Sequence, residues 1–115
     1  TYALIEIAKG NVKFAYYLNT EFVVTDITLA EFYAVLLREE DEKVADYWLR
    51  KLERYSLSVT KEILIEAIRF RHEHRKQDVS FFDAVGYIFS IKNGYYFAAG
   101  DKEFKNLPNV EFRKK

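Results

Sequence analysis

The chain has 115 residues, of which 50% are hydrophobic and 17% aromatic, which is enough to build the core of one domain spanning residues 1–115. Lysine and arginine together number 18, as do aspartate and glutamate, so no overall charge indicates a nucleic acid partner. The absence of cysteine excludes disulfides, thiolate metal sites and cysteine nucleophiles. No apolar run approaches the roughly 18 residues that a membrane span needs, and we expect a cytoplasmic protein with no membrane partner.

The first third of the chain predicts two short helices and then a strand. Residues 3–9 and 12–19 have apolar side chains at helical spacing, and residues 22–27 are rich in the β-branched and aromatic side chains that favour strands. Thr28 and Glu31 follow in the pattern of a capping box. We therefore expect a helix to begin there, with Glu31 in its first turn.

The middle of the chain predicts a helix, a short strand and a second helix. The acidic run over residues 39–42 favours a helix start through the helix dipole, which is a more ordinary role than a metal site. Residues 56–59 suit a strand, and Thr60 is placed to cap a long amphipathic helix. The side chains that we expect to face inward on the two helices are Val44, Tyr47, Trp48, Leu49, Leu52, Ile63, Leu64, Ala67, Ile68 and Phe70.

The second of these helices ends in a basic stretch from Arg69 to Lys76. The helix dipole favours positive charge at a C-terminus and accounts for the stretch on structural grounds, although the stretch also suits phosphate contacts. His72 and His74 are two residues apart and point to different sides of a helix. They do not form a zinc motif, which needs histidines about four residues apart.

A further helix and strand follow, and each carries an acidic residue. Ser80 stands three residues before Asp83, which predicts a helix N-terminus with Asp83 in the first turn, and Asn93-Gly94 predicts the end of the helix. Residues 95–99 form a short apolar run that suits a buried strand. Asp101 follows this strand directly, at the kind of position where α/β proteins place their chemistry.

The predicted strands lie over residues 22–27, 56–59, 95–99 and 110–112, and the last of them is an edge strand. They alternate with helices along the chain. This alternation predicts an α/β fold, a three-layer sandwich around a mostly parallel central sheet.

Three acidic side chains, Glu31, Asp83 and Asp101, are expected at one edge of such a sheet. Each alone has an ordinary explanation as a capping or turn residue. Brought together, like charges raise one another's pKa unless a cation neutralises them, and oxygen ligands suit Mg²⁺ or Mn²⁺. Because such ions promote in-line attack on phosphodiesters, we select these three acids as candidate catalytic and metal-binding residues.

The order of the motifs along the chain resembles the PIN domain, in particular the toxin ribonucleases of the VapC type. The motifs that carry the resemblance are the run from Ile27 to Tyr33, Ser80 to Ala84, Gly94, Gly100-Asp101 and Glu103-Phe104. The resemblance implies a Mg²⁺- or Mn²⁺-dependent endoribonuclease with Glu31, Asp83 and Asp101 among its metal-binding acids. It also implies an RNA substrate, a homodimer and a cognate antitoxin protein that blocks the site.

The sequence departs from the PIN pattern at two places. PIN domains open with a strand that ends in Asp, followed by Thr or Ser and usually Asn, whereas this chain opens at Thr1-Tyr2, just after the expected Asp. We therefore expect an N-terminally incomplete chain, whose first strand and acid precede Thr1 in the natural protein. Ala99 stands where the family often has Thr or Ser before Gly-Asp, which removes a hydroxyl that supports the ligands.

Other functions also fit these residues. A catalytically inactive PIN-like module would bind a protein partner through its aromatic surface, for which nine Tyr and ten Phe provide apolar area. A phosphatase or a DNA nuclease would use the same three acids, because they determine the metal chemistry more closely than the substrate. Metal-dependent cleavage of RNA distinguishes the ribonuclease from these alternatives.

Overall fold

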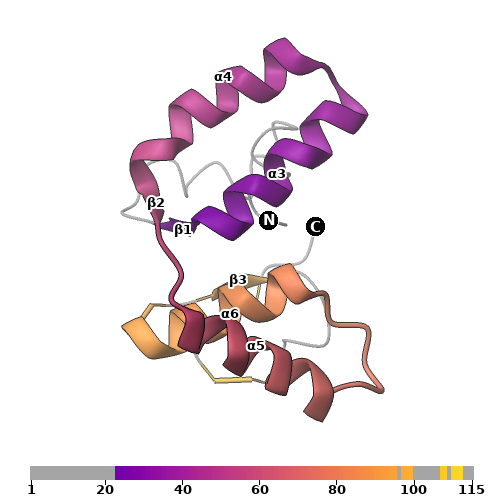
Figure 1. Cartoon of the computed structure of the whole chain (residues 1–115), viewed down its shortest axis with the longest axis vertical. Coiled ribbons are helices and arrows are strands. Elements are labelled where there is room, and N and C mark those ends of the chain that lie inside the picture. The colour runs from indigo at the N-terminus through magenta and orange to yellow at the C-terminus, as the bar shows by residue number, and fades with distance from the viewer. Residues whose placement is uncertain (1–22, 96, 100–106, 109, 113–115) are drawn as a thin grey trace.

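The computed structural model describes residues 23–95, 97–99, 107–108 and 110–112 (Figure 1). In chain order its elements are β1 (Val24–Thr25), α3 (Asp26–Glu39), α4 (Glu42–Leu52), the 3₁₀ turn η2 (Glu53–Tyr55), β2 (Ser56–Leu57), α5 (Lys61–Glu73), α6 (Phe81–Asn93), β3 (Phe97–Ala99) and β4 (Val110–Phe112). The helices predicted over residues 3–9 and 12–19 lie outside the described residues. None of the described helices is long and apolar enough to cross a bilayer.

The described strands pair in parallel. β1 pairs with β2 in a register that sets Val24 opposite Ser56, and β3 pairs with β4 in a register that sets Phe97 opposite Val110. Parallel neighbours need a crossover connection, and α3 and α4 form the crossover between β1 and β2. These pairs confirm the predicted α/β fold with parallel strands.

Two helical hairpins, each with its own hydrophobic core, make up most of the described structure. α3 packs against α4, and α5 packs against α6 (Figure 1). The α3–α4 core consists of Val24, Leu29, Phe32, Leu36, Ala45 and Leu52. The α5–α6 core consists of Ile63, Ala67, Phe70, Val79, Ala84, Val85, Tyr87, Ile88 and Phe89.

The segment from Val23 to Ile27 joins the two cores. Val24 is buried in the α3–α4 core, whereas Val23 and Ile27 pack against the α5–α6 core. Successive side chains of an extended backbone point to opposite faces, so the neighbours Val23 and Val24 enter different cores. α3 also packs against α6, which gives the two hairpins a second contact.

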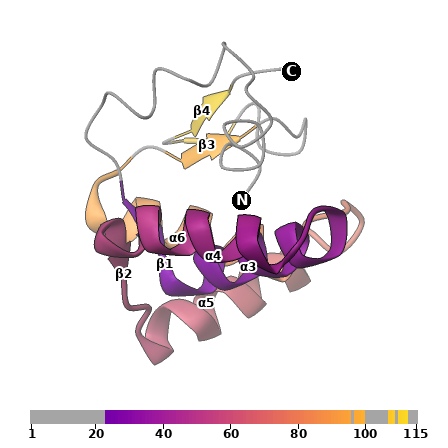
Figure 2. The ribbon, with the colours of Figure 1, turned by 90° about the horizontal axis from the view of Figure 1, so that it is seen from above.

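α6 is the most deeply buried helix of the described structure. All of its residues from Ala84 to Ser90 are buried. In Figure 2 the β3–β4 pair lies on one side of α6 and α5 on the other, and both contact it. A helix that is apolar all round is stable only when neighbours cover it in this way. Both hydroxyls in the run are satisfied, because Ser90 Oγ donates to the Gly86 carbonyl oxygen and Tyr87 Oη donates to the Pro108 carbonyl oxygen, each at 2.9 Å.

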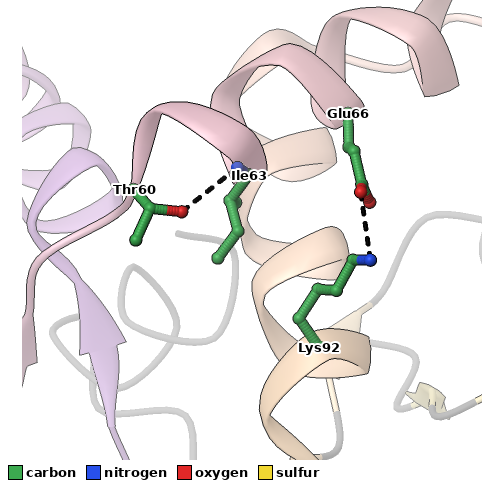
Figure 3. Close-up of polar contacts among 4 residues, drawn as sticks. All are labelled: Thr60, Ile63, Glu66 and Lys92. Carbon is green, nitrogen blue, oxygen red and sulfur yellow. Dashed lines mark hydrogen bonds and ion pairs between the residues drawn. The ribbon is translucent and has the colours of Figure 1, made fainter.

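The helix starts predicted in the acidic run over residues 39–42 and at Thr60 are confirmed. Asp41 Oδ1 accepts a hydrogen bond from the Val44 backbone N–H at 2.9 Å, and Thr60 Oγ1 accepts one from the Ile63 N–H at 3.3 Å. Figure 3 shows the Thr60 cap together with the ion pair between Lys92 and Glu66, 3.0 Å from Nζ to Oε1, which links α6 to α5. Short-range capping chemistry therefore determines where α4 and α5 begin.

Two side chains that the sequence places inward are exposed instead. Ile68 of α5 is 49% exposed and Tyr47 of α4 is 47% exposed. α5 is covered on one side by α6 and buries Ile63, Ala67 and Phe70 there, so Ile68 lies beyond the covered stripe. The prediction was wrong because the apolar stripe in the sequence is wider than the surface that the neighbouring helix covers.

Candidate functional site

Asp83 lies in the first turn of α6, as the sequence predicts. The helix begins after Ser80, whose Oγ accepts a hydrogen bond from the Asp83 backbone N–H at 3.1 Å. The Asp83 side chain is half-buried, and burial is the largest cause that raises its pKa above the ordinary value. The negative charge of Glu31 raises the pKa further, while a hydrogen bond with the Ser80 side chain lowers it. Asp83 is thus an acid held in a poorly solvated position.

The structure places Glu31 in the second turn of α3, which corrects the predicted first turn. α3 begins at Asp26, and the cap is Thr25, not Thr28. Thr25 Oγ1 accepts a hydrogen bond from the Thr28 backbone N–H at 2.9 Å, so Thr28 is already inside the helix. Glu31 is therefore not a capping residue, and it lies half-buried on α3.

The packing of α3 against α6 brings Glu31 close enough to Asp83 to affect its pKa. Coulomb interactions between side chains weaken with distance and are screened by water, so Glu31 acts on Asp83 across the contact between α3 and α6. No hydrogen bond or ion pair from Glu31 or Asp83 to a basic side chain is found within the described ranges. We call the two carboxylates the acid pair, since the charge of Glu31 adds to the effect of burial in raising the Asp83 pKa.

The acid pair fits a hard divalent cation. Carboxylate oxygens are the preferred donors of Mg²⁺ and Mn²⁺, and a cation would relieve the repulsion that raises the Asp83 pKa. Among the residues that the structure describes, no third acid or histidine completes a metal-binding group. Asp101, the third predicted ligand, lies outside the described residues.

The basic end of α5 lies beside the start of α6. Arg71 Nε donates to the Val79 carbonyl oxygen at 3.0 Å, which holds its guanidinium against the segment leading to Ser80. The His74 ring stacks on Phe70 with centroids 4.1 Å apart, and its Nδ1 lies 2.9 Å from the Phe70 carbonyl oxygen. This contact gives His74 a structural role. The positive end of α5 and the carboxylate of the first turn of α6 are therefore at the same end of this hairpin.

Sequence reasoning did not identify a pair of buried hydroxyls that supports α3. Thr25 and Thr28 are 3% and 8% exposed, and Thr25 Oγ1 donates to Thr28 Oγ1 at 2.9 Å. The available signal was a threonine followed by Asp26, because an acid in the first turn favours a helix start. By anchoring the first turn, the hydroxyl pair positions the following turn, which carries Glu31.

The fold and the acid pair define an α/β protein with parallel strands and a candidate cation site between two helices. The sequence matches the PIN domain family over residues 1–110, almost the whole chain. The chain therefore belongs to the PIN domain family. No curated protein sequence matches it at a significant level.

Two solved structures share the fold. One is described as a toxin–antitoxin complex from Klebsiella pneumoniae, with a TM-score of 0.76 and 15% sequence identity over 99% of this chain and 95% of that one. The other is VapC20 of Mycobacterium tuberculosis, described as a toxin that cleaves the sarcin-ricin loop, with a TM-score of 0.73 and 23% identity over 91% of this chain and 85% of that one. At these identities the likeness establishes the fold and agrees with the resemblance to VapC-type PIN domains.

Proposed function

We propose that this protein is a metal-dependent endoribonuclease that hydrolyses RNA phosphodiester bonds. The observation that carries the proposal is the acid pair: Glu31 of α3 raises the pKa of Asp83 of α6, in a chain of the PIN domain family. Burial and the negative charge of Glu31 both raise the Asp83 pKa, and carboxylates with perturbed pKa values cluster at functional sites.

Glu31 and Asp83, with Asp101 as a third ligand, would hold Mg²⁺ or Mn²⁺. When bound, such an ion neutralises charge on a phosphodiester and lowers the pKa of a water molecule. The chain itself supplies the framework: the Ser80 cap fixes the turn that carries Asp83, and partial burial limits the water around its carboxylate. A lysine or arginine from the stretch Arg69–Lys76, at the same end of the hairpin, would bind the RNA backbone.

We further propose that the protein is the toxin of a toxin–antitoxin pair and forms a homodimer. Support for the antitoxin comes from the fold shared with a chain from a toxin–antitoxin complex. Support for self-association comes from the large apolar side chains that the described surface exposes. These are Leu37, Tyr47, Leu57, Ile65, Ile68, Ile91 and Tyr95.

The test is cleavage of a labelled RNA by the protein with Mg²⁺ or Mn²⁺. We expect cleavage that stops with a chelator and that falls by at least about 100-fold, the scale for losing a key electrostatic group, in Glu31→Gln, Asp83→Asn and Asp101→Asn. Asp78→Asn is the matched control, because Asp78 is an exposed acid in the loop before α6. Persisting cleavage in the Asp101→Asn protein would refute the assignment of that ligand.

The second candidate function is a non-catalytic module that binds a protein partner, and the exposed apolar side chains favour it. This alternative predicts no RNA cleavage by the wild-type protein with either metal, together with self-association that depends on concentration. A wild-type protein that cleaves RNA only with metal excludes it.

A further inference from the structure

The C-terminal half of α4 carries an exposed group of one aromatic and three basic side chains. We call it the α4 platform, and it consists of Tyr47, Arg50, Lys51 and Arg54, the last at the adjoining η2 turn. All four are exposed, and their positions follow the helical pattern i, i+3, i+4 and i+7. Residues at this spacing lie on one face of a helix. The platform is therefore a continuous surface rather than a set of scattered side chains.

The aromatic ring of the platform is anchored in the protein. The Tyr47 ring packs on Trp48 with centroids 5.5 Å apart, and Trp48 makes an edge contact with Phe32 at 6.3 Å. Phe32 is 1% exposed and belongs to the α3–α4 core. Lys51 Nζ lies over both rings, 5.6 Å from the Tyr47 centroid and 5.1 Å from the Trp48 centroid. A ring held in this way loses little conformational freedom when a partner stacks on it.

The positive charges of the platform are not neutralised within the described structure. The ion pairs found among the described residues are Arg38–Glu39 and Lys92–Glu66, and neither involves the platform. Asp46, an acid of the same helix, accepts a hydrogen bond from Tyr33 Oη at 2.6 Å, which directs it toward α3. Residues 47–54 contain three basic residues and one acid, in a chain whose formal net charge is zero. The uneven charge favours an anionic partner.

We propose that the α4 platform binds single-stranded RNA, with a base stacked on Tyr47 and phosphates at Arg50, Lys51 and Arg54. Single-stranded nucleic acid is recognised by exposed aromatic rings beside positive charges, since every base has a face for stacking and every phosphate carries a negative charge. Arg54 also donates to Tyr55 Oη at 3.0 Å, but none of the three cations forms an ion pair among the described residues. Phe32, which contacts Trp48, directly follows Glu31 in α3, so the platform lies one helix away from the acid pair. The inference rests on the proposed ribonuclease function, for which it supplies a substrate-binding surface outside the catalytic acids.

The test is fluorescence anisotropy of a labelled polyuridine oligonucleotide with the full-length protein in EDTA, so that binding is measured without cleavage. Tyr47→Ala should weaken binding by about 5- to 150-fold, the scale of losing one base–aromatic stack, while Tyr47→Phe should keep the wild-type affinity. The triple variant with alanine at 50, 51 and 54 should reduce the slope of log affinity against log salt by about 2, since each phosphate contact on a single strand contributes about 0.7.

Lys61→Ala is the charge control, because Lys61 is an exposed basic residue at the start of α5. It should leave affinity and salt slope unchanged, and circular dichroism should show that every variant is folded. Wild-type binding that is absent in EDTA, or that is equal in wild-type, Tyr47→Ala and triple-variant proteins, overturns the proposal. Unchanged RNA binding with altered sedimentation of the variants would instead assign the surface to contact between copies of the chain.

The catalytic acids separate this inference from the proposed function. Asp83→Asn should lower cleavage by at least about 100-fold yet keep RNA binding that depends on Tyr47. If the wild-type protein binds RNA through the α4 platform but does not cleave it, the proposed ribonuclease function is refuted and the proposed RNA-binding surface still holds. If the platform substitutions change neither RNA cleavage nor RNA binding, only the proposed RNA-binding role of the α4 platform is refuted.

Discussion

Replacing Thr25 by valine tests whether its hydroxyl determines the start of α3. Valine keeps the shape of threonine but removes the acceptor for the Thr28 backbone N–H, a loss of about 1 kcal/mol for an ordinary helix cap. It also removes the hydrogen bond to the buried Thr28 hydroxyl, which contributes about 0.5–1.5 kcal/mol. The free energy of unfolding should therefore fall by about 1.5–2.5 kcal/mol.

This loss corresponds to a measurable change in melting temperature. Unfolding entropies of about 2.1 cal/mol/K per residue give about 0.24 kcal/mol/K for 115 residues, so the melting temperature should fall by about 6–10 °C. Urea denaturation followed by circular dichroism gives the free energy, and a thermal melt gives the temperature. Thr25→Ser is the matched control, because it keeps the hydroxyl and loses one buried methyl, worth about 0.8 kcal/mol. A valine variant as stable as the serine variant would show that the hydroxyl is not the cap.

Three further outcomes are expected. Without metal, Asp83→Asn should be more stable than wild type at pH 7. Because the pKa of Asp83 is raised in the folded state, the stability that a protonated Asp83 provides is fully present below its unfolded-state pKa and is lost as the pH rises through its folded-state pKa. The urea midpoints of wild type and Asp83→Asn should therefore converge in acid. Mg²⁺ or Mn²⁺ at 100 times its dissociation constant should stabilise wild type by about 2.7 kcal/mol, and calorimetry should show no such gain for Glu31→Gln. Gly94→Ala should lower the free energy of unfolding by about 1–2 kcal/mol in a urea titration, and Gly94→Asn should lower it less. The φ angle of Gly94 is 72°, so a side chain there strains the backbone, although an added Cβ would meet no atom within 4 Å.

Local capping chemistry explains which parts of the fold the sequence predicts well. The Ser80 cap and the left-handed Gly94 were both expected, and they mark the two ends of α6 in the structure. Thr25 and Thr28 show the limit, because both are threonines close to an acid and the local pattern does not choose between them. The choice depends on burial: Thr25 is the last residue of a strand that pairs with β2, and its hydroxyl is buried against the first turn.

The candidate site depends on information that no local pattern contains. The pKa effect of Glu31 on Asp83 arises because α3 packs against α6, a contact between segments separated by two other helices. The sequence places both acids near helix starts, but their proximity was expected from parallel-sheet geometry and from the resemblance to PIN domains. The position of Asp101 relative to the pair stays a prediction.

The acid pair lies across the boundary between the two hairpins, with Glu31 on a helix of the α3–α4 core and Asp83 on a helix of the α5–α6 core. An ion bound by both acids would therefore link the two hairpins and stabilise their contact. By linkage, whatever loosens the docking of the hairpins weakens ion binding, even without touching a ligand. A substitution at Val23 or Ile27, which attach the α3 segment to the α5–α6 core, would then lower metal affinity from a distance.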